Sequence, residues 1–260
     1  MFFKNFKVWE TEFAGRKLSV ETGKMAGLAN ASVMVRYGDT NVLCTVTASA
    51  KPREGVDFFP LSVDYEEKMY SVGRIPGSFQ RREGRASEKA ILTSRCIDRP
   101  IRPLFPKDLR NDCSVVATVM SVDPDCSPEI AAMIGVSTAI AMSDIPWDGP
   151  ISRVNVGLVH GEIVLNPTLE QRAKTDLNLT VASTADLVAM IEAGGNEISD
   201  DLMFDCIMAG HEENKKIVKF IQGIVDEIGK PKFAYESSDP DPEIMKEIED
   251  FCIEDVKKAL

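Results

Sequence analysis

Apolar and polar residues alternate in several short segments of the first half of the chain, and these segments are rich in Val, Leu and Thr. An alternation of period two places alternate side chains on opposite faces of an extended strand, so it predicts β-strands. The predicted strands cover residues 17–22, 31–37, 41–48, 61–67 and 114–122. Gly38-Asp39 separates the second and third of these strands and predicts a hairpin at that point.

Two helices are expected among these strands. Ser87 can cap a helix that runs to about Asp98, and Pro100 is expected to end it. Ser127-Pro128 starts a second helix, whose many small residues allow it to pack closely against a sheet.

The second half of the chain predicts another sheet, followed by helices. Its expected strands cover residues 152–159, 162–165, 177–182 and 186–191, with a turn at 160–161. Two helical runs follow, one from Ser199 and one from about Glu212, which we expect to be divided near Gly210. Gly229 is expected to close the second run.

The last part of the chain predicts a linker and an amphipathic helix. Residues 233–240 have the composition of a linker, and a helix with an apolar stripe begins at Asp241-Pro242. The stripe is still unfinished at Leu260, so we expect the helix to belong to a longer all-α segment. The fold class is therefore α+β (α/β), with mixed sheets packed on helices. The expected parts are residues 1–145, 146–232 and 233–260.

Charge is distributed very unevenly. The formal net charge is −11, but residues 74–110 contain ten basic and four acidic side chains, which gives this segment a charge of +6. Eight of the ten basic residues are Arg, whose planar guanidinium group suits bidentate contact with phosphate. A nucleotide or a nucleic acid is therefore the expected partner.

The basic segment begins with a loop, because glycines and Pro76 interrupt residues 73–84. Phe79 lies in this loop, and an aromatic side chain among arginines is typical of a groove for single-stranded nucleic acid. The arginines concerned are Arg81, Arg82 and Arg85. The alternative is a surface in which these arginines pair with nearby acids and Phe79 packs against the body. The pattern leaves both interpretations open.

Composition excludes several other classes of site. Six scattered cysteines without a CxxC motif are expected to be reduced core residues, and with only two histidines they do not predict a zinc site. No Walker-type phosphate loop is present. The beginning of the sequence has no signal-peptide pattern, and no apolar run has the length of a membrane span, so we expect a cytoplasmic protein without a membrane partner.

Several motifs together resemble the first ribonuclease PH-like domain of the bacterial polynucleotide phosphorylases, and the resemblance covers essentially the whole chain. The residues that carry it are Val20–Lys24, Val35–Thr40, Gly73–Arg85 and Thr93–Pro106. The family implies a homotrimeric ring that draws single-stranded RNA through a central channel and is associated with RNA-degradation machinery. Inorganic phosphate, the co-substrate, attacks the terminal phosphodiester and releases nucleoside diphosphates, and the reaction is reversible.

The resemblance also implies roles for individual residues. In the family, a Phe-Phe-Arg-Arg loop grips RNA, and its residues correspond here to Phe79, Arg81 and Arg82, with Arg85 as a helper. The second aromatic of that motif is Gln80 in this sequence. Two further arginines could support a substrate phosphate, although a structural salt bridge with a nearby acid is an equal alternative for them. These are Arg99 and Arg102.

The resemblance implies that this chain has no catalytic residues and no metal site. In the family, the second half carries an Asp, another Asp six residues later and a Lys two further, which bind Mg²⁺ and the reacting phosphate. The corresponding positions here hold Arg172, Asn178 and Thr180, and Asp176 alone does not replace the pair of carboxylates. Two alternatives remain: a stand-alone ribonuclease PH-like phosphorylase that processes tRNA, and a non-enzymatic RNA-binding scaffold like the inactive ring subunits of exosomes.

Overall fold

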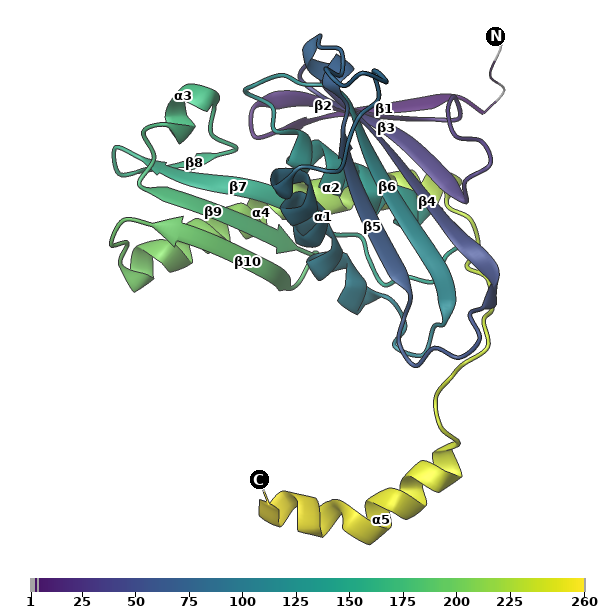
Figure 1. Ribbon diagram of the computed structural model, residues 1–260. Coiled ribbons are helices and arrows are strands. Elements are labelled where there is room, and N and C mark those ends of the chain that lie inside the picture. Colours follow the sequence, from purple (N-terminus) through teal and green to yellow (C-terminus); the bar gives the residue numbers. More distant parts are fainter. Residues whose placement is uncertain (1–2, 4, 260) are drawn as a thin grey trace.

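The computed structural model describes residues 3 and 5–259, which form two β-sheets with helices between and beside them (Figure 1). The first sheet has six strands in the order β1-β2-β3-β4-β6-β5. Its strands are β1 (Lys7–Phe13), β2 (Arg16–Thr22), β3 (Ala31–Tyr37), β4 (Thr40–Pro52), β5 (Leu61–Glu67) and β6 (Asn111–Ser121). β5 runs parallel to β6 and the other pairs are antiparallel, so the sheet is mixed, as predicted.

The predicted hairpin at Gly38-Asp39 is confirmed. Tyr37, the last residue of β3, pairs with Thr40, the first residue of β4. Gly38 and Asp39 therefore form the whole connection between the two strands. Gly38 has a φ of +57°, and a Cβ at this position would lie 2.5 Å from the Sγ of Cys126. Backbone conformation and close packing therefore both require glycine here.

The second sheet has four antiparallel strands in the order β10-β9-β7-β8. Its strands are β7 (Ser152–Val159), β8 (Glu162–Leu165), β9 (Leu177–Ser183) and β10 (Val188–Gly195). The predicted strands are confirmed, although β10 begins two residues later and ends four residues later than expected. A short helix, α3 (Leu169–Arg172), lies between β8 and β9 and was not predicted.

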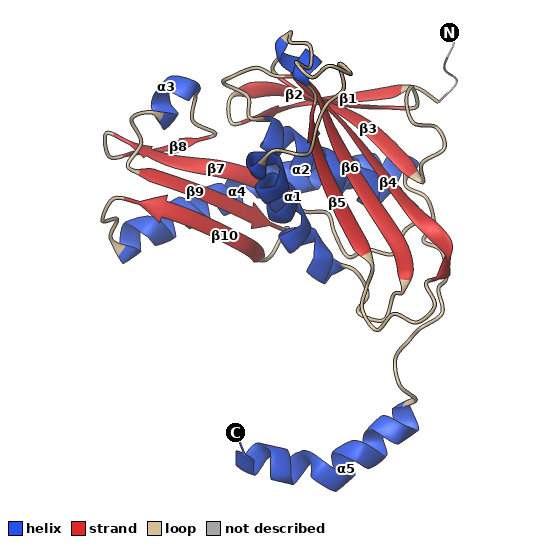
Figure 2. Cartoon of the chain, in the orientation of Figure 1, coloured by secondary structure: helices blue, strands red, loops and turns tan. Residues whose placement is uncertain are grey.

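Helix α2 (Pro128–Met142) forms the centre of the molecule and touches both sheets and helix α4 (Figure 2). Nearly every residue of α2 is buried, which explains why it lacks an amphipathic stripe. Small residues allow the close approach: a Cβ on Gly135 would lie 2.5 Å from the Sγ of Cys44 on β4. The predicted close packing of this helix against a sheet is confirmed.

Helix α1 (Glu88–Ile101) lies between the two sheets and contacts β5 and β10. The Ser87 hydroxyl caps it, as predicted, by accepting the N–H of Ala90 at 3.0 Å. The prediction that Pro100 ends this helix was wrong, because the helix continues to Ile101 and then becomes a short 3₁₀ segment. Pro100 lies in the last turn, where the loss of one backbone hydrogen bond is tolerated and the ring is buried in the core.

Helix α4 (Asp200–Ile228) is one continuous helix of 29 residues, so the predicted division near Gly210 was wrong. Gly210 is buried against the second sheet, where a Cβ would lie 3.1 Å from a methyl group of Val156 and of Val181. This glycine provides space for a neighbouring strand and does not end the helix. Strand β1 was not predicted; Lys7 and Trp9 on it both donate to the carboxylate of Glu227 on α4.

The segment after Gly229 has neither helix nor strand up to Asp241, as predicted for the linker, but it is fixed to the body. The Nζ of Lys232 donates to three carbonyls at the end of α2, and Phe233 N–H donates to Asp144. Tyr235 Oη donates to Asp108 at 2.8 Å, and Ser238 bonds the carbonyl of the same residue. The linker therefore follows a defined path along the molecule.

Helix α5 (Pro242–Ala259) confirms the predicted terminal helix and lies away from the body in Figure 1. No residue of its described part is buried, and its apolar stripe, which includes Ile248 and Phe251, is exposed. Leu260 lies outside the described residues. Within the part of the chain that the structure describes, no helix has both the length and the apolar character needed to span a membrane. The division into residues 1–145, 146–232 and 233–260 stays a prediction.

Candidate nucleic-acid interface

The arginine loop, residues 73–87, connects a short 3₁₀ segment (Met69–Val72) to helix α1. Gly73 caps the 3₁₀ segment with a left-handed backbone (φ 69°), and Ser87 caps α1 at the other end. Both ends of the loop are therefore fixed by regular structure. The loop lies at the end of β5, at the edge of the six-stranded sheet.

The tip of the loop is a tight turn closed by Ser78. The N–H of Arg81 donates to the carbonyl of Ser78 at 3.0 Å, and the Ser78 hydroxyl bonds both the carbonyl and the N–H of Arg82. Arg81 has a φ of +52°, which is uncommon for a residue other than glycine. The turn presents Phe79, Gln80 and Arg81 together to solvent.

Phe79 has no packing role in this structure, because its relative exposure is 102%. A buried apolar ring contributes about 1.5–3 kcal/mol of transfer free energy, and this ring forgoes that gain. The interpretation of Phe79 as a packing anchor therefore does not hold. An exposed ring next to arginines remains free to stack on a base.

The arginines of the loop are also free of acidic partners. Among the described residues, none of Arg81, Arg82 and Arg85 forms an ion pair, although Glu83 lies between them in sequence. Glu83 instead contacts Lys68 and the N–H of Met69. The salt-bridged alternative is therefore not what the structure shows for these three side chains.

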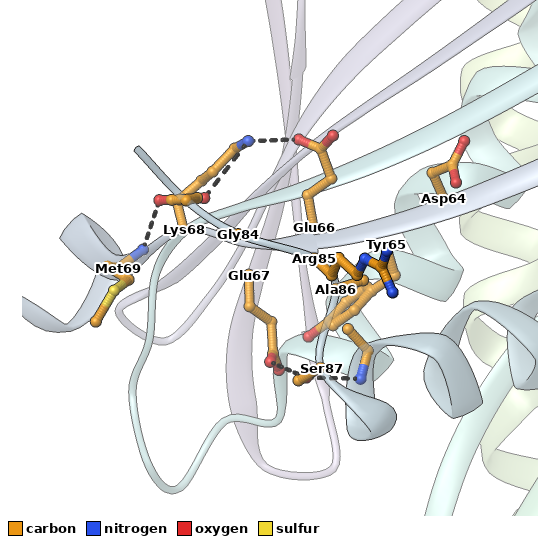
Figure 3. Close-up of a pocket in the computed structure, with 12 residues that line it drawn as sticks. Asp64, Tyr65, Glu66, Glu67, Lys68, Met69, Gly84, Arg85, Ala86 and Ser87 are labelled. Carbon is orange, nitrogen blue, oxygen red and sulfur yellow. Dashed lines mark hydrogen bonds and ion pairs between the residues drawn. The ribbon is translucent and has the colours of Figure 1, made fainter. Parts of the chain in front are cut away.

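A cavity of about 430 Å³ lies between the returning limb of the loop and strand β5 (Figure 3). Arg85 and Tyr65 both line this cavity, and Glu67 accepts a hydrogen bond from the Ser87 hydroxyl. The Tyr65 hydroxyl is buried without a hydrogen-bond partner among the residues that the structure describes, and burial raises the pKa of this phenol. Carboxylates predominate on the β5 side of the cavity, and Arg85 is the arginine that lines it from the loop.

Arg102 and Arg99 differ in what they contact. The guanidinium group of Arg102 makes a bidentate pair with Asp98 at 2.9 and 2.7 Å and also donates to the carbonyls of Phe59 and Leu61. These contacts are those of the structural salt bridge considered as the alternative. Arg99 forms no hydrogen bond or ion pair through its side chain within the described residues, so a phosphate-binding role for it stays a prediction.

A second cavity, of about 550 Å³, lies between α1 and the second sheet. We call it the degenerate cavity, because Asn178 and Thr180 line it and the resemblance aligns them with two of the three positions expected to hold metal and phosphate ligands in the active half of the family. Its other polar and sulfur-containing lining residues are Glu88, Lys89, Thr93, Cys96, Arg153 and Glu192. Arg172 does not line it; this residue ends α3 and donates to the carbonyl of Pro124.

Arg153 on β7 is the feature of this cavity that the sequence analysis missed. Its relative exposure is 7%, and one guanidinium nitrogen donates to the Thr180 hydroxyl at 3.4 Å. The Nε and Nη1 atoms of Arg153 are buried and have no hydrogen-bond partner among residues 3 and 5–259. The sequence signal was one arginine in the predicted strand 152–159, but only the contacts of β7 with β9, α2 and α4 in three dimensions show that this strand is buried.

The donor set of the degenerate cavity does not fit Mg²⁺, which requires several hard oxygen ligands and usually carboxylates. Lys89 and Arg153 supply positive charge at the site. One of the two lining carboxylates, Glu192, accepts a hydrogen bond from the Cys96 thiol, with 3.0 Å between Oε2 and Sγ. Burial and this hydrogen bond raise the pKa of the Cys96 thiol above its ordinary value, which disfavours the thiolate form. No group of three or more metal-ligating side chains occurs among the described residues.

The two sheets around α2, together with the loop, define the class of protein. The model for domain 1 of the 3′ exoribonuclease family matches residues 14–146, and the model for domain 2 matches residues 149–213. The chain therefore belongs to the 3′ exoribonuclease family. Its fold is that of a ribonuclease PH-like domain, as the sequence predicted.

Curated relatives narrow this class further. The chain is 60% identical over 255 residues to polyribonucleotide nucleotidyltransferase of Ruminiclostridium cellulolyticum and 56% identical over 254 residues to the protein of the same name from Clostridioides difficile. Each match covers 98% of this chain and 36% of the relative. The chain thus spans about a third of the length of these relatives, and the resemblance to polynucleotide phosphorylases is confirmed.

A solved structure supports the fold independently. Rrp46 from rice (Oryza sativa) matches with a TM-score of 0.63 over 86% of this chain and 95% of that chain, at 16% sequence identity. At this identity the likeness concerns the fold alone.

Proposed function

We propose that this chain is the RNA-binding, catalytically silent first core domain of a phosphorolytic 3′-to-5′ exoribonuclease. The complete enzyme would degrade mRNA to nucleoside diphosphates with inorganic phosphate as co-substrate and would run in reverse as a polymerase. It would act as a homotrimer in the cytoplasm and associate with RNA-degradation machinery. The name shared by the curated relatives, polyribonucleotide nucleotidyltransferase, supports this proposal.

One observation carries the RNA-binding part of the proposal. The tip of the arginine loop presents a fully exposed phenylalanine beside arginines that have no acidic partner among the described residues. Free guanidinium groups bind phosphates, and a free ring stacks on a base of any sequence. Phe79, Arg81, Arg82 and Arg85 are the proposed RNA-binding residues, and Arg99 is a proposed helper. Arg102 stabilises the region that supports them.

The donor set of the degenerate cavity supports the catalytic silence. Phosphoryl transfer depends on neutralisation of charge by metal ions and cations at the reacting phosphate. The cavity has amide, hydroxyl and cationic groups where a metal site needs carboxylates. We therefore assign Mg²⁺ and the catalytic step to a second ribonuclease PH-like half of the complete enzyme.

Two alternatives remain as competing proposals. A stand-alone tRNA-processing phosphorylase requires a working metal site, which the cavity does not supply. A non-enzymatic ring scaffold is compatible with the loop and the cavity, and it differs only in what the rest of the protein contains. The curated relatives are almost three times as long as the match, which favours an enzyme with further domains.

The RNA-binding part is tested by the dependence of binding on salt. Each phosphate contact on a single strand contributes about −0.7 to the slope of log K against log salt. Replacement of Arg81, Arg82 and Arg85 by Ala is expected to flatten this slope by about two units in titrations with labelled oligo(A).

A matched control removes the same charge elsewhere. Lys174, Lys215 and Lys219 lie in the second half of the chain, away from the loop, and their replacement by Ala should leave the slope almost unchanged. An unchanged slope in the arginine variant would show that the loop does not bind RNA. Equal flattening in both variants would show that binding depends on overall charge alone.

A further inference from the structure

Glu83 is an unexpected residue in an RNA-binding loop, because its carboxylate repels a polyanion. The structure directs this side chain away from the arginines that flank it. Its Oε1 atom accepts the backbone N–H of Met69 at 2.9 Å, and its Oε2 atom lies 3.7 Å from the Nζ of Lys68. Glu83 thus connects the returning limb of the loop to the segment that precedes it.

The partner of Glu83 is itself fixed to the sheet. Lys68 Nζ lies 2.7 Å from the carboxylate of Glu66 on β5, and this hydrogen bond raises the pKa of Lys68 (Figure 3). Lys68 therefore remains charged well above neutral pH. Through Lys68, the carboxylate of Glu83 is linked to a strand of the six-stranded sheet.

The loop is therefore closed at two places. Ser78 closes the tip by its bonds to Arg82, and Glu83 closes the base by its bonds to Lys68 and Met69. We propose that Glu83 is a positioning residue that holds the arginines of the tip in their RNA-binding arrangement. This inference rests on the proposed RNA-binding function.

The two effects of a carboxylate at this position have opposite signs, which makes the proposal testable. As a charge, Glu83 weakens the attraction of RNA, so its removal alone would strengthen binding. As an anchor, it keeps the loop preorganised, so its removal lets the loop leave the binding-competent state and weakens binding. The direction of the change in affinity therefore distinguishes the two roles.

Asp64 is a matched control for the charge effect. It lies on β5, lines the same cavity and is exposed (Figure 3). Its side chain makes no hydrogen bond or ion pair with any other described residue. Asp64→Asn thus removes one negative charge close to the loop without releasing an anchor.

The experiment measures the affinity for labelled oligo(A) at one salt concentration. Glu83→Ala is expected to weaken binding about five- to tenfold, because the apparent dissociation constant rises as the competent fraction falls. Glu83→Gln should retain most of the affinity, since its amide carbonyl can still accept the N–H of Met69. Asp64→Asn should leave the affinity unchanged or raise it.

Hydrogen exchange provides a readout that is independent of RNA. Glu83→Ala should accelerate amide exchange at residues 78–85 in the absence of RNA, while strand β6 remains protected and the unfolding temperature stays close to that of the parent chain. Unchanged exchange in the loop would contradict the anchoring role.

Two further outcomes would overturn the proposal. Equal or tighter RNA binding by Glu83→Ala would show that the charge effect dominates, and an equal loss in Asp64→Asn would show that the effect is not specific to the anchor. The variant without Arg81, Arg82 and Arg85 separates these failures from failure of the proposed function. If that variant loses binding but Glu83→Ala does not, only the role of Glu83 is refuted.

Discussion

The arginine loop and the degenerate cavity use the same functional group in opposite environments. In the loop, guanidinium groups are exposed and have no acidic partner among the described residues. In the cavity, the guanidinium group of Arg153 is buried, and two of its nitrogens have no hydrogen-bond partner in the described part of the chain. An exposed guanidinium can exchange water for phosphate at little cost, whereas a buried one has already lost its water. The position of an arginine in the fold therefore decides whether its guanidinium group can bind the phosphates of a polymer.

The comparison also shows why the proposed RNA binding and the proposed lack of catalysis are physically compatible in one domain. Binding needs only cations and an aromatic ring on a loop, and these are present. Cleavage by phosphate needs a metal held by carboxylates, and the cavity supplies cations in that place. The two functions have separate physical requirements, so one can be lost while the other remains.

The largest expected effect concerns catalysis. The chain, given oligo(A), Mg²⁺ and inorganic phosphate, should release no ADP above background, because the cavity presents amide and hydroxyl groups of Asn178 and Thr180, with cations beside them, where the resembled family is expected to hold its metal and phosphate. Chromatography of the nucleotides measures this release, and a full-length relative serves as the positive control. Robust ADP release by the pure chain would contradict the assignment of binding to the arginine loop and of no catalysis to the degenerate cavity. The cavity would then be an active site.

The variant Arg172→Asp, Asn178→Asp, Thr180→Lys extends this test. It restores the family's ligand types, but Arg172 does not line the cavity, and the cationic groups of Lys89 and Arg153 remain. We therefore expect no turnover from this variant, because the supporting groups around the ligands are missing.

The next effect concerns Phe79 and Gln80 at the tip of the loop. Phe79→Ala should weaken binding of oligo(A) by about 1–2 kcal/mol, roughly tenfold, because stacking of one base is lost. Gln80→Phe should tighten binding, since it adds a second ring to the tip. Fluorescence anisotropy at fixed salt measures both. If Phe79→Ala binds oligo(A) as tightly as the parent chain, binding by the loop depends on its arginines and not on stacking by Phe79.

The smallest effect compares two arginine substitutions directly. Arg153→Met should leave RNA binding unchanged and raise the free energy of unfolding by about 1 kcal/mol, because a poorly paired buried charge is replaced by an apolar side chain of similar length. Arg81→Met should have the opposite profile: weaker RNA binding, and a stability within about 0.5 kcal/mol of the parent chain. Urea unfolding and RNA titration of both variants give the four values. A destabilised Arg153→Met variant would mean that the guanidinium group stabilises the fold.

Most strands could be predicted from the sequence, because apolar and polar residues alternate in them or because one face of the strand is exposed. It failed where tertiary contacts override local signals. Gly210 suggests a helix break, but its lack of a side chain serves close packing against β7 and β9. Strand β1 has polar residues on both faces, so it lacks a clear alternation; it pairs with β2 along its whole length, and Lys7 and Trp9 also donate to Glu227, more than 200 positions later.

The candidate site was predictable to a different extent in each region. Glycines and Pro76 identify the loop, and its arginines identify the chemistry. The full exposure of Phe79, the left-handed backbone of Arg81 and the orientation of Glu83 depend on three-dimensional contacts that no local pattern contains. Likewise, Arg153 becomes notable only when β7 is covered on both faces.

Lys232 gives the linker a mechanical role. Its ammonium group donates to the carbonyls of Ile140, Ala141 and Ser143 at 3.3, 2.9 and 2.8 Å, at the end of the most deeply buried helix. A force that pulls on α5 would first act on the hydrogen bonds of Ser238 and Tyr235 with Asp108. It would then act on the hydrogen bond of Phe233 and on the contacts of Lys232 with the end of α2. A force on the C-terminal segment would thus reach helix α2, because the linker is attached to the body of the molecule along its length.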